Sequence, residues 1–266
     1  MPINFCTIAS GSSGNSAFLS TDKIKILIDA GLSGKAIETA LASRGVNCCD
    51  IDAIFITHEH SDHVQGAGVL SRRFDVPIYL TKGTWSYVEQ YKNLGKIAEK
   101  NRLVAIPDMP ITLEDVIITP FSVPHDANDP VGYTICTENC KIAIATDLGH
   151  VTDDVAHNFC DADVIMIESN HDIDMLKNGP YPPHLKRRIL SDIGHLSNTS
   201  CGVFLAEIFS LKTKHIFLAH LSQDNNHPAL AFQTVKDILN AKKIDAGGAV
   251  GLYLADRNKP SAMLRM

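Results

Sequence analysis

The densest group of potential metal ligands in the sequence lies between His58 and His63. Its six consecutive residues include His58, His60 and His63 together with the carboxylate of Asp62. Imidazole nitrogens bind zinc and related transition metals, and a carboxylate suits a hard cation or a bridging role. A single histidine is usually a surface or satisfied core residue, but this density in one segment predicts a metal site.

The apolar segment 53–56 precedes this group, is rich in β-forming residues and predicts a buried strand. If the chain stays extended after residue 57, His58 and His60 point to the same side and can share one cation. Residues 64–70 can begin a helix, which would place Asp62 and His63 at its start, where they could hold a second cation.

More ionisable residues occur at the carboxyl ends of other predicted strands, namely His125, Asp147 and His220. Taken singly, these residues could cap a turn, cap a helix or lie on the surface. Together with the first group they supply five imidazoles and two carboxylates. Such a set suits two metal ions that share one bridging carboxylate.

The elements that must position these side chains alternate along the chain, and hydrophobic periodicity and turn residues mark their ends. They predict an α/β-type sandwich whose strand ends converge on one edge. We expect strands at residues 3–8, 17–20, 24–29, 53–57, 77–80, 116–123, 131–137, 141–146, 163–167, 215–219, 250–254 and 262–265, and helices at 33–44, 84–92, 197–210 and 228–240.

A loop of small residues, 9–16, separates the first two predicted strands and contains Asn15. Small residues allow backbone amides to approach an anion closely. A simple hairpin turn and a phosphate contact are both consistent with this loop.

Length and charge set limits on the protein class. With 266 residues the chain can bury a large core, as one large domain or two fused halves. Its net charge of -6 argues against sequence-wide attraction to nucleic acid or membranes, although a local basic patch can still bind a polyanion. The densest basic segment is Lys186, Arg187 and Arg188, close to Tyr181, which could stack on a base.

The cysteines and the apolar segments indicate the compartment. The seven cysteines are odd in number and contain no C-x-x-C pair, which predicts reduced thiols in a cytoplasmic protein. No segment has the length of a membrane span, and no secretory signal is visible at the amino terminus. We therefore expect a cytoplasmic protein that does not bind membranes.

The pattern H-x-H-x-D-H at 58–63, with Asp29 before it and His125, Asp147 and His220 after it, resembles the metallo-β-lactamase fold superfamily over essentially the whole chain. The resemblance implies an α+β fold, a four-layer αβ/βα sandwich with the site on one edge between two β-sheets. It also implies a single domain, residues 1–266, made of two similar halves at roughly 1–130 and 131–266.

The resemblance also assigns roles to the ligands. His58, His60 and His125 would bind the first metal, Asp62, His63 and His220 the second, and Asp147 would bridge them. Asp29 would lie outside the ligand set and orient the histidine loop. Two divalent ions are implied, with Zn²⁺ first and Mn²⁺ or Fe²⁺ as alternatives.

Three residues indicate the branch of the superfamily. Asp147 favours phosphodiesterases over hydrolytic β-lactamases, and Glu168 and His195 resemble residues of the tRNA 3′-processing nucleases. In that branch the histidine is placed to protonate the leaving oxygen, while a water bridging two cations loses its proton near neutral pH. Asp62, Glu168 and His195 are the predicted catalytic residues, with Glu168 holding His195 in place.

Segments 9–16, 168–172 and 220–228 resemble a narrower set, the YycJ/WalJ group of stand-alone bacterial proteins. This resemblance implies a DNA exonuclease that acts 5′ to 3′, with a link to mismatch repair, and favours DNA over RNA as the partner. Protein partners are not indicated. The alternatives are an RNA nuclease, a hydrolase of a cyclic or alkyl phosphodiester, a thioester or a lactone, and a non-catalytic binding protein. Asn15, Lys186 and Arg187 are the expected outer-layer or substrate contacts.

Overall fold

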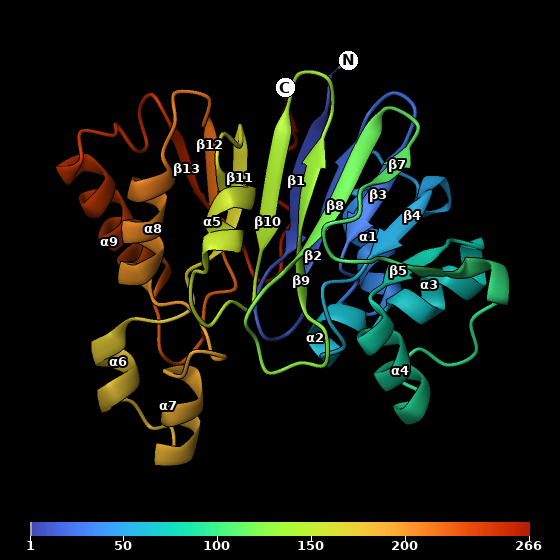
Figure 1. Cartoon of the computed structure of the whole chain (residues 1–266), viewed down its shortest axis with the longest axis horizontal. Helices are drawn as coiled ribbons and strands as arrows, with labels where there is room; N and C mark the ends of the chain where they lie inside the picture. The colour runs from blue at the N-terminus through green and yellow to red at the C-terminus, as the bar shows by residue number, and fades with distance from the viewer. Residues whose placement is uncertain (1) are drawn as a thin grey trace.

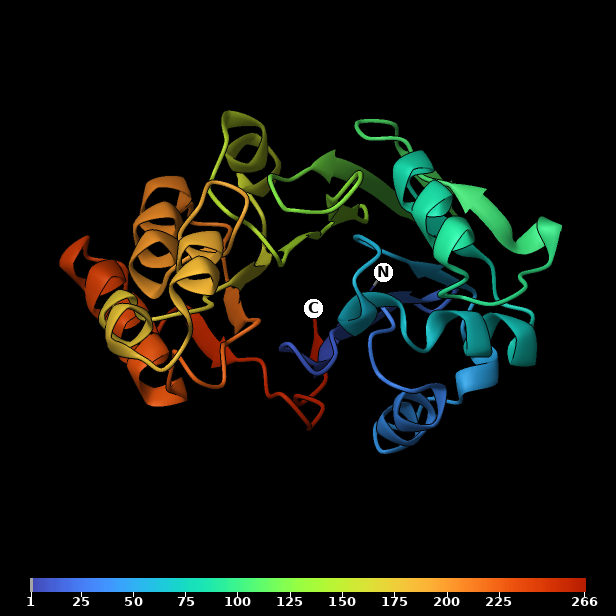
Figure 2. The same ribbon diagram turned by 90° about the horizontal axis from the view of Figure 1, so that it is seen from below.

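Two seven-stranded β-sheets lie face to face in the computed structural model, which describes residues 2–266 (Figure 1). Apolar side chains of both sheets form one core between them. Phe5 and Phe217, one from each sheet, meet edge to face with ring centroids 5.3 Å apart. Each sheet also packs against the helices on its outer face through a core of its own. The helices flank the pair of sheets on both sides, which confirms the predicted αβ/βα sandwich (Figure 2).

The first sheet has the order β14-β1-β2-β3-β4-β5-β6. Most of its strands come from the beginning of the chain, and the last strand of the chain joins its edge. Its strands are β1 (Asn4–Ala9), β2 (Ser16–Ser20), β3 (Lys25–Ile28), β4 (Ala53–Phe55), β5 (Ile78–Leu80), β6 (Arg102–Val104) and β14 (Leu264–Arg265), and its helices are α1 (Gly34–Ala42), α2 (Ser61–Val64), α3 (Ala67–Phe74) and α4 (Lys82–Tyr91).

The second sheet has the order β13-β12-β11-β10-β9-β8-β7. Strands β9 and β10 form the predicted antiparallel hairpin. The strands are β7 (Ile111–Leu113), β8 (Val116–Ser122), β9 (Val131–Cys136), β10 (Lys141–Ala145), β11 (Val164–Glu168), β12 (His215–Ala219) and β13 (Gly251–Leu254), and the helices are α5 (Asp153–Phe159), α6 (Ile173–Asn178), α7 (Pro183–Ile189), α8 (Asn198–Ile208) and α9 (Pro228–Ala241).

Helix caps agree with the sequence signals at two places. The Ser33 side chain accepts a hydrogen bond from the backbone N–H of Ala36 and begins α1. Ser197 accepts in the same way from Ser200 at the start of α8. An oxygen at this position satisfies one of the free N–H groups of the first turn, which is why serine favours it.

Several elements differ from the sequence prediction. Strands β6 and β7 and the short helices α2, α5, α6 and α7 were not predicted. Strand β4 ends at Phe55, so His58 and His60 lie in a loop and not on an extended strand. The chain passes from the first sheet to the second between Val104 and Ile111. The division into similar halves near residue 130 stays a prediction.

Parallel pairing brings the functional side chains to one edge. Strands β3 and β4 run parallel in the first sheet, and β10, β11 and β12 run parallel in the second. Because parallel strands end on the same edge, the residues that follow them gather there. Asp29, Asp147 and His220, which follow β3, β10 and β12, have left-handed backbone with φ of 61°, 59° and 53°. Such a conformation is uncommon for residues other than glycine, and three of the nine non-glycine residues that have it in the described part of the chain lie at this edge.

Candidate metal centre

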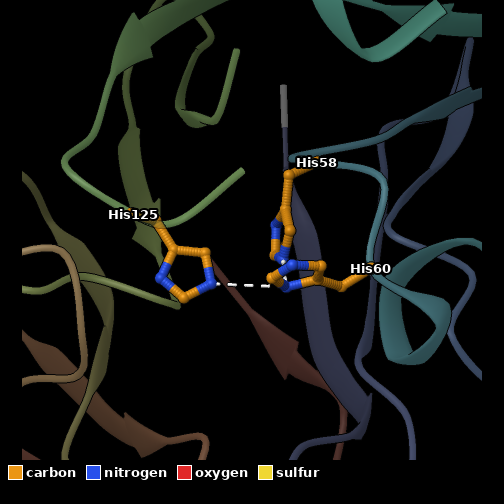
Figure 3. Close-up of side chains that lie close together, drawn as sticks. All are labelled: His58, His60 and His125. Atoms are coloured by element: carbon orange, nitrogen blue, oxygen red, sulfur yellow. Dashed lines mark hydrogen bonds between the residues drawn. The ribbon is translucent and has the colours of Figure 1, made fainter. Parts of the chain in front are cut away.

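The first group of ligands consists of His58, His60 and His125 (Figure 3). Nε2 of His58 lies 3.0 Å from Nδ1 of His60, and Nε2 of His125 lies 3.4 Å from the same atom. The group joins the two sheets, because His125 follows β8 whereas the other two follow β4. Nδ1 of His125 is 3.2 Å from the carbonyl oxygen of Gly194 and donates to it, because a carbonyl only accepts. This leaves its Nε2 as a lone-pair donor for a cation.

The second group consists of Asp62, His63 and His220. Oδ2 of Asp62 lies 3.7 Å from Nε2 of His63 and 3.6 Å from Nε2 of His220. Asp62 and His63 lie in the first turn of α2, as the sequence predicted for a helix starting nearby. Three donors therefore meet from two different sheets.

Asp147 lies between the two groups. Its Oδ2 is 2.8 Å from Nε2 of His63, and its Oδ1 is 3.7 Å from Nε2 of His125. The carboxylate thus faces a member of each group, which is the placement expected of a bridging ligand. Burial raises the pKa of Asp147, but His220 and His63 more than offset this and hold it well below the usual value.

Asp29 contacts the histidine loop. Its Oδ1 accepts a hydrogen bond of 2.8 Å from the Thr57 N–H, and its Oδ2 lies 2.8 Å from Nδ1 of His63. A carboxylate only accepts, so His63 donates from Nδ1 and its Nε2 faces the other ligands. Such outer carboxylates fix the tautomer and the orientation of a metal-binding imidazole.

Glu168 has the corresponding position on the second sheet. Its Oε1 lies 2.9 Å from Nδ1 of His195 and 2.7 Å from Nδ1 of His220, and its Oε2 accepts from the N–H groups of Leu148 and Leu196. The side chain is fully buried. Burial raises its pKa, but His195 and His220 more than offset this and lower it to about 2. Glu168 is therefore a carboxylate that accepts one N–H from each of two imidazoles.

His195 lies at the rim of the site, with its side chain 15% exposed. Burial lowers the pKa of His195, but the charge and hydrogen bond of Glu168 more than offset this and raise it above the usual value. Because Nδ1 donates to Glu168, a proton on Nε2 is the one that His195 can transfer. The histidine is thus held by a buried acid and left accessible on one side.

The small-residue loop lies against the second group of ligands. Nδ2 of Asn15 is 3.4 Å from Oδ2 of Asp62 and 3.0 Å from Nε2 of His63. The Asn15 N–H donates to the carbonyl oxygen of Asp62. Gly31 is required beside this contact, because a Cβ there would lie 1.7 Å from the same oxygen. The loop therefore holds the metal-binding segment as well as forming a turn.

The donor set fits two divalent cations. Nε2 of His220 is buried and has no hydrogen-bond partner, although it lies among other donor atoms. Burial, with the charge of His63, holds the pKa of His58 well below its usual value and keeps it in the neutral form that a metal requires. Nitrogen and carboxylate donors in this ratio suit zinc, manganese or iron.

Comparison with known proteins identifies the family. A family model described as the β-lactamase superfamily domain matches residues 25–220. The chain belongs to the metallo-β-lactamase superfamily. Among solved structures, the metallo-β-lactamase fold protein YhfI from Bacillus subtilis superposes with a TM-score of 0.72 at 17% identity, over 98% of this chain and 99% of that one. At this identity the likeness supports the fold alone.

Two relatives within the superfamily match nearly the whole chain. Exodeoxyribonuclease YycJ of Bacillus anthracis is 40% identical over 98% of this chain and 98% of its own. Exodeoxyribonuclease WalJ of Streptococcus pneumoniae is 40% identical over 97% of this chain and 95% of its own. The resemblance that the sequence motifs indicated is confirmed.

The basic segment lies on α7, and Lys186 as a substrate contact stays a prediction. Nζ of Lys186 donates a hydrogen bond to the carbonyl oxygen of Lys177, which lies in α6. Arg188 instead reaches the site, where its Nε donates to Oδ2 of Asp126, and Oδ1 of Asp126 lies 3.2 Å from Nε2 of His125. Arg187 as a substrate contact stays a prediction. Tyr181 donates its hydroxyl hydrogen to Asp224 at 2.8 Å.

Sequence reasoning missed several buried polar residues around the ligands. Oε1 of Glu59 accepts 2.8 Å and 2.6 Å hydrogen bonds from the backbone and side chain of Asn128, which ties the histidine loop to the loop after His125. Asn226 donates to the carbonyl oxygens of Ser169 and Asn170 and so joins the segments that carry Glu168 and His220. Asparagine and glutamate in polar loops give no periodic signal, and only their nearness to predicted ligands could have singled them out.

Proposed function

We propose that this protein is a dinuclear metal-dependent exodeoxyribonuclease that degrades DNA from the 5′ end. The observation that carries the proposal is the 40% identity to Exodeoxyribonuclease YycJ over 98% of both chains. The chain also brings a complete set of seven donor residues to one edge of its two sheets. Near-full-length identity supports the substrate class, and the donor set supports the chemistry.

The geometry supports the following ligand roles. His58, His60 and His125 would hold the first cation, and Asp62, His63 and His220 the second, with Asp147 between them. When bound, two divalent cations lower the pKa of a water molecule and neutralise the charge of the attacked phosphate. Zinc is the first choice for this donor set, with manganese or iron as alternatives.

His195 acts as the general acid in this proposal. Its Nδ1 donates to Glu168, so the proton on Nε2 is directed to the open side of the site. The raised pKa of His195 favours its protonated form, which can protonate the leaving oxygen. Proton transfer from a positioned side chain contributes about two to four orders of magnitude in rate.

Arg188 is the basic residue best placed to contact the substrate backbone. Its Nε donates to Asp126, and the Arg188 side chain is 48% exposed, so the outer N–H groups of the guanidinium can donate to a phosphate. Asp126 in turn lies against His125. The guanidinium is thus held at a fixed distance from the first group of ligands.

The test is release of nucleotides from end-labelled DNA. Purified protein supplied with Zn²⁺ or Mn²⁺ is expected to release mononucleotides from the 5′ end of a DNA strand, with little action on the same sequence in RNA. Asp62→Ala is the control, because it removes one ligand of the second group and leaves His195, at the rim of the site, unchanged. Equal behaviour of wild type and Asp62→Ala, with no release by either, would contradict the proposal.

We also propose a cytoplasmic location. All seven cysteines are free thiols, and Cys49 and Cys160 among them are exposed. Exposed free thiols are typical of a reducing compartment. No helix in residues 2–266 is both long and apolar enough to cross a membrane.

A further inference from the structure

A cavity of about 460 Å³ lies next to the metal centre. Segments 221–223, 226–228 and 254–258 form its walls, together with Ser10. Ser10 is shared with the metal centre, because its Oγ accepts a 2.8 Å hydrogen bond from the N–H of His220. The cavity therefore begins where the second group of ligands ends, and its volume is in the range of small-ligand sites.

Arg257 supplies positive charge to this cavity. Its Nη2 donates to the carbonyl oxygen of Leu221 at 2.9 Å, and its Nη1 to Oγ of Ser12 at 3.4 Å. Leu221 is the residue after the ligand His220, so the guanidinium is fixed beside the centre. It also packs on Gly11, where a Cβ would lie 3.3 Å from its Cζ.

No carboxylate forms an ion pair with Arg257 within residues 2–266. The neighbouring Asp256 accepts from the N–H groups of Asn258 and Lys259 through Oδ1. Asp224, which does not line the cavity, accepts a hydrogen bond from the hydroxyl of Tyr181. The charge of the guanidinium is therefore not neutralised by a carboxylate and can attract an anionic ligand. Its planar arrangement of N–H groups suits a phosphate.

Two further groups in the cavity favour an anion. Ser222, two residues after the ligand His220, lines the cavity, and its oxygen accepts from Asn225, so that its O–H hydrogen remains to be donated. Helix α9, fourteen residues long, begins at Pro228, which also lines the cavity, and the amino end of a helix carries partial positive charge. These groups add to the charge of Arg257 and do not define the site without it.

We infer that this cavity binds the terminal phosphomonoester of the DNA strand, with Arg257 as the residue that recognises the strand end. The inference rests on the proposed function and adds its end specificity. A terminal phosphate carries more charge than an internal phosphodiester and offers three acceptor oxygens to a guanidinium. A strand whose terminal phosphate is held here would present a nearby internal phosphate to the metal centre, and an internal stretch of DNA would leave the cavity unfilled.

The test compares single-turnover cleavage of DNA strands that differ only at their ends. Strands with 5′-phosphate, 5′-hydroxyl or 3′-phosphate are offered to wild type, Arg257→Gln, Arg257→Lys and Arg72→Gln. Arg72 is a matched control, because its guanidinium also donates to a main-chain carbonyl, that of Leu94, and packs on a glycine, Gly95. Metal content is measured for each variant, so that loss of the centre is separated from loss of end recognition.

Wild type and Arg72→Gln are expected to cleave the 5′-phosphorylated strand roughly ten- to a hundredfold faster than the 5′-hydroxyl strand, the size expected of hydrogen bonds to a charged group. Arg257→Gln should abolish that ratio with two metal ions retained, and Arg257→Lys should keep part of it.

Equal rates on both 5′ ends in wild type, or a preference that survives in Arg257→Gln, would overturn the inference while the exonuclease activity stands. A preference for 3′-phosphate that depends on Arg257 would support the cavity and overturn the proposed polarity. No release from any strand by wild type would overturn the proposed function, and this inference with it.

Discussion

The two sheets build their parts of the centre in different ways. The first sheet supplies His58, His60, Asp62 and His63 from one loop and one helical turn, supported by Asp29. The second sheet supplies single residues that follow separate strands, and Glu168 connects one of them, His220, to His195 in the loop between α7 and α8. One side is a compact ligand cluster, and the other is a network of separate segments.

This difference separates two tasks. Asp29 contacts Nδ1 of His63, a ligand, and so acts on metal binding. Glu168 contacts Nδ1 of both His220, a ligand, and His195, which lies at the rim. In the proposed function, the second sheet would therefore couple a cation to a transferable proton through one buried carboxylate. Substitutions on the two sides should have different signatures.

The largest effect is expected from His60→Ala on the first side. The Nε2 atoms of His58 and His125 both lie within 3.4 Å of Nδ1 of His60. Removing the His60 imidazole therefore removes the donor atom that is close to both of the others. We expect fewer than two metal ions per chain and a loss of nucleotide release greater than the 10- to 100-fold typical of residues behind the ligands. Metal analysis and rate on the same sample check this. Full metal content in this variant would contradict the ligand assignment.

His195→Ala should lower turnover by about two to four orders of magnitude, because it removes the general acid. Two metal ions per chain should remain, which separates this variant from His60→Ala. His150→Ala is a matched control, since His150 is exposed, belongs to none of the possible ligand groups and has its Nδ1 2.8 Å from the carbonyl oxygen of Asp192. If His195→Ala lost metal in proportion to activity, its role would be that of a ligand.

Glu168→Gln should change the pH dependence. An acid must be protonated to act, so turnover falls as pH rises through the pKa of His195. The Glu168 charge raises that pKa against the opposing effect of burial, and Gln removes the charge. The basic limb of the kcat profile should therefore move to lower pH. Asp29→Asn should lower metal affinity about 10- to 100-fold and leave the position of that limb unchanged. An unmoved limb in Glu168→Gln would show that His195 is not the titrating acid.

The smallest effect concerns stability on the second side. His171 follows β11 and is buried, and neither ring nitrogen has a hydrogen-bond partner. Burial lowers its pKa from 6.5 to about 4 despite the opposing charge of Glu168. The neutral form is favoured in the fold, so its contribution is complete above pH 6.5 and is lost as pH falls toward 4.

His171→Asn should therefore reduce the acid sensitivity of the fold. Between pH 7.5 and 5.5, wild type should lose about 1 kcal/mol more unfolding free energy than this variant, as measured by urea denaturation of metal-free protein. Equal losses in both proteins would mean that His171 is accessible to protons in the folded state.

The sequence was most informative on the first side of the centre. There, one contiguous motif holds four ligands, and strand ends predict where the others gather. On the second side, Asp147 and His220 could be found because a polar residue follows a clear apolar strand. Glu168 and His195 depended on resemblance, since a lone glutamate at the end of a strand has no distinctive spacing.

Other features could not be predicted because they depend on tertiary contacts. Helix α7 was not expected, and the direction of each of its basic residues depends on its packing, so Arg188 rather than Lys186 faces the centre. The amide of Asn226 joins segments far apart in sequence, and nothing local to it indicates those partners. Strand β4 ends early because Thr57 bonds to Asp29 instead of continuing the ladder.

The most direct test is a metal titration of metal-free wild type with simultaneous measurement of nucleotide release from 5′-end-labelled DNA. Mn²⁺ is added in fractions of an equivalent, and bound metal is counted per chain. Two cations held by one bridging carboxylate predict little release up to the first equivalent, a rise between the first and second, and saturation at two. Full release with one bound ion per chain, or none with two, would contradict a dinuclear exodeoxyribonuclease.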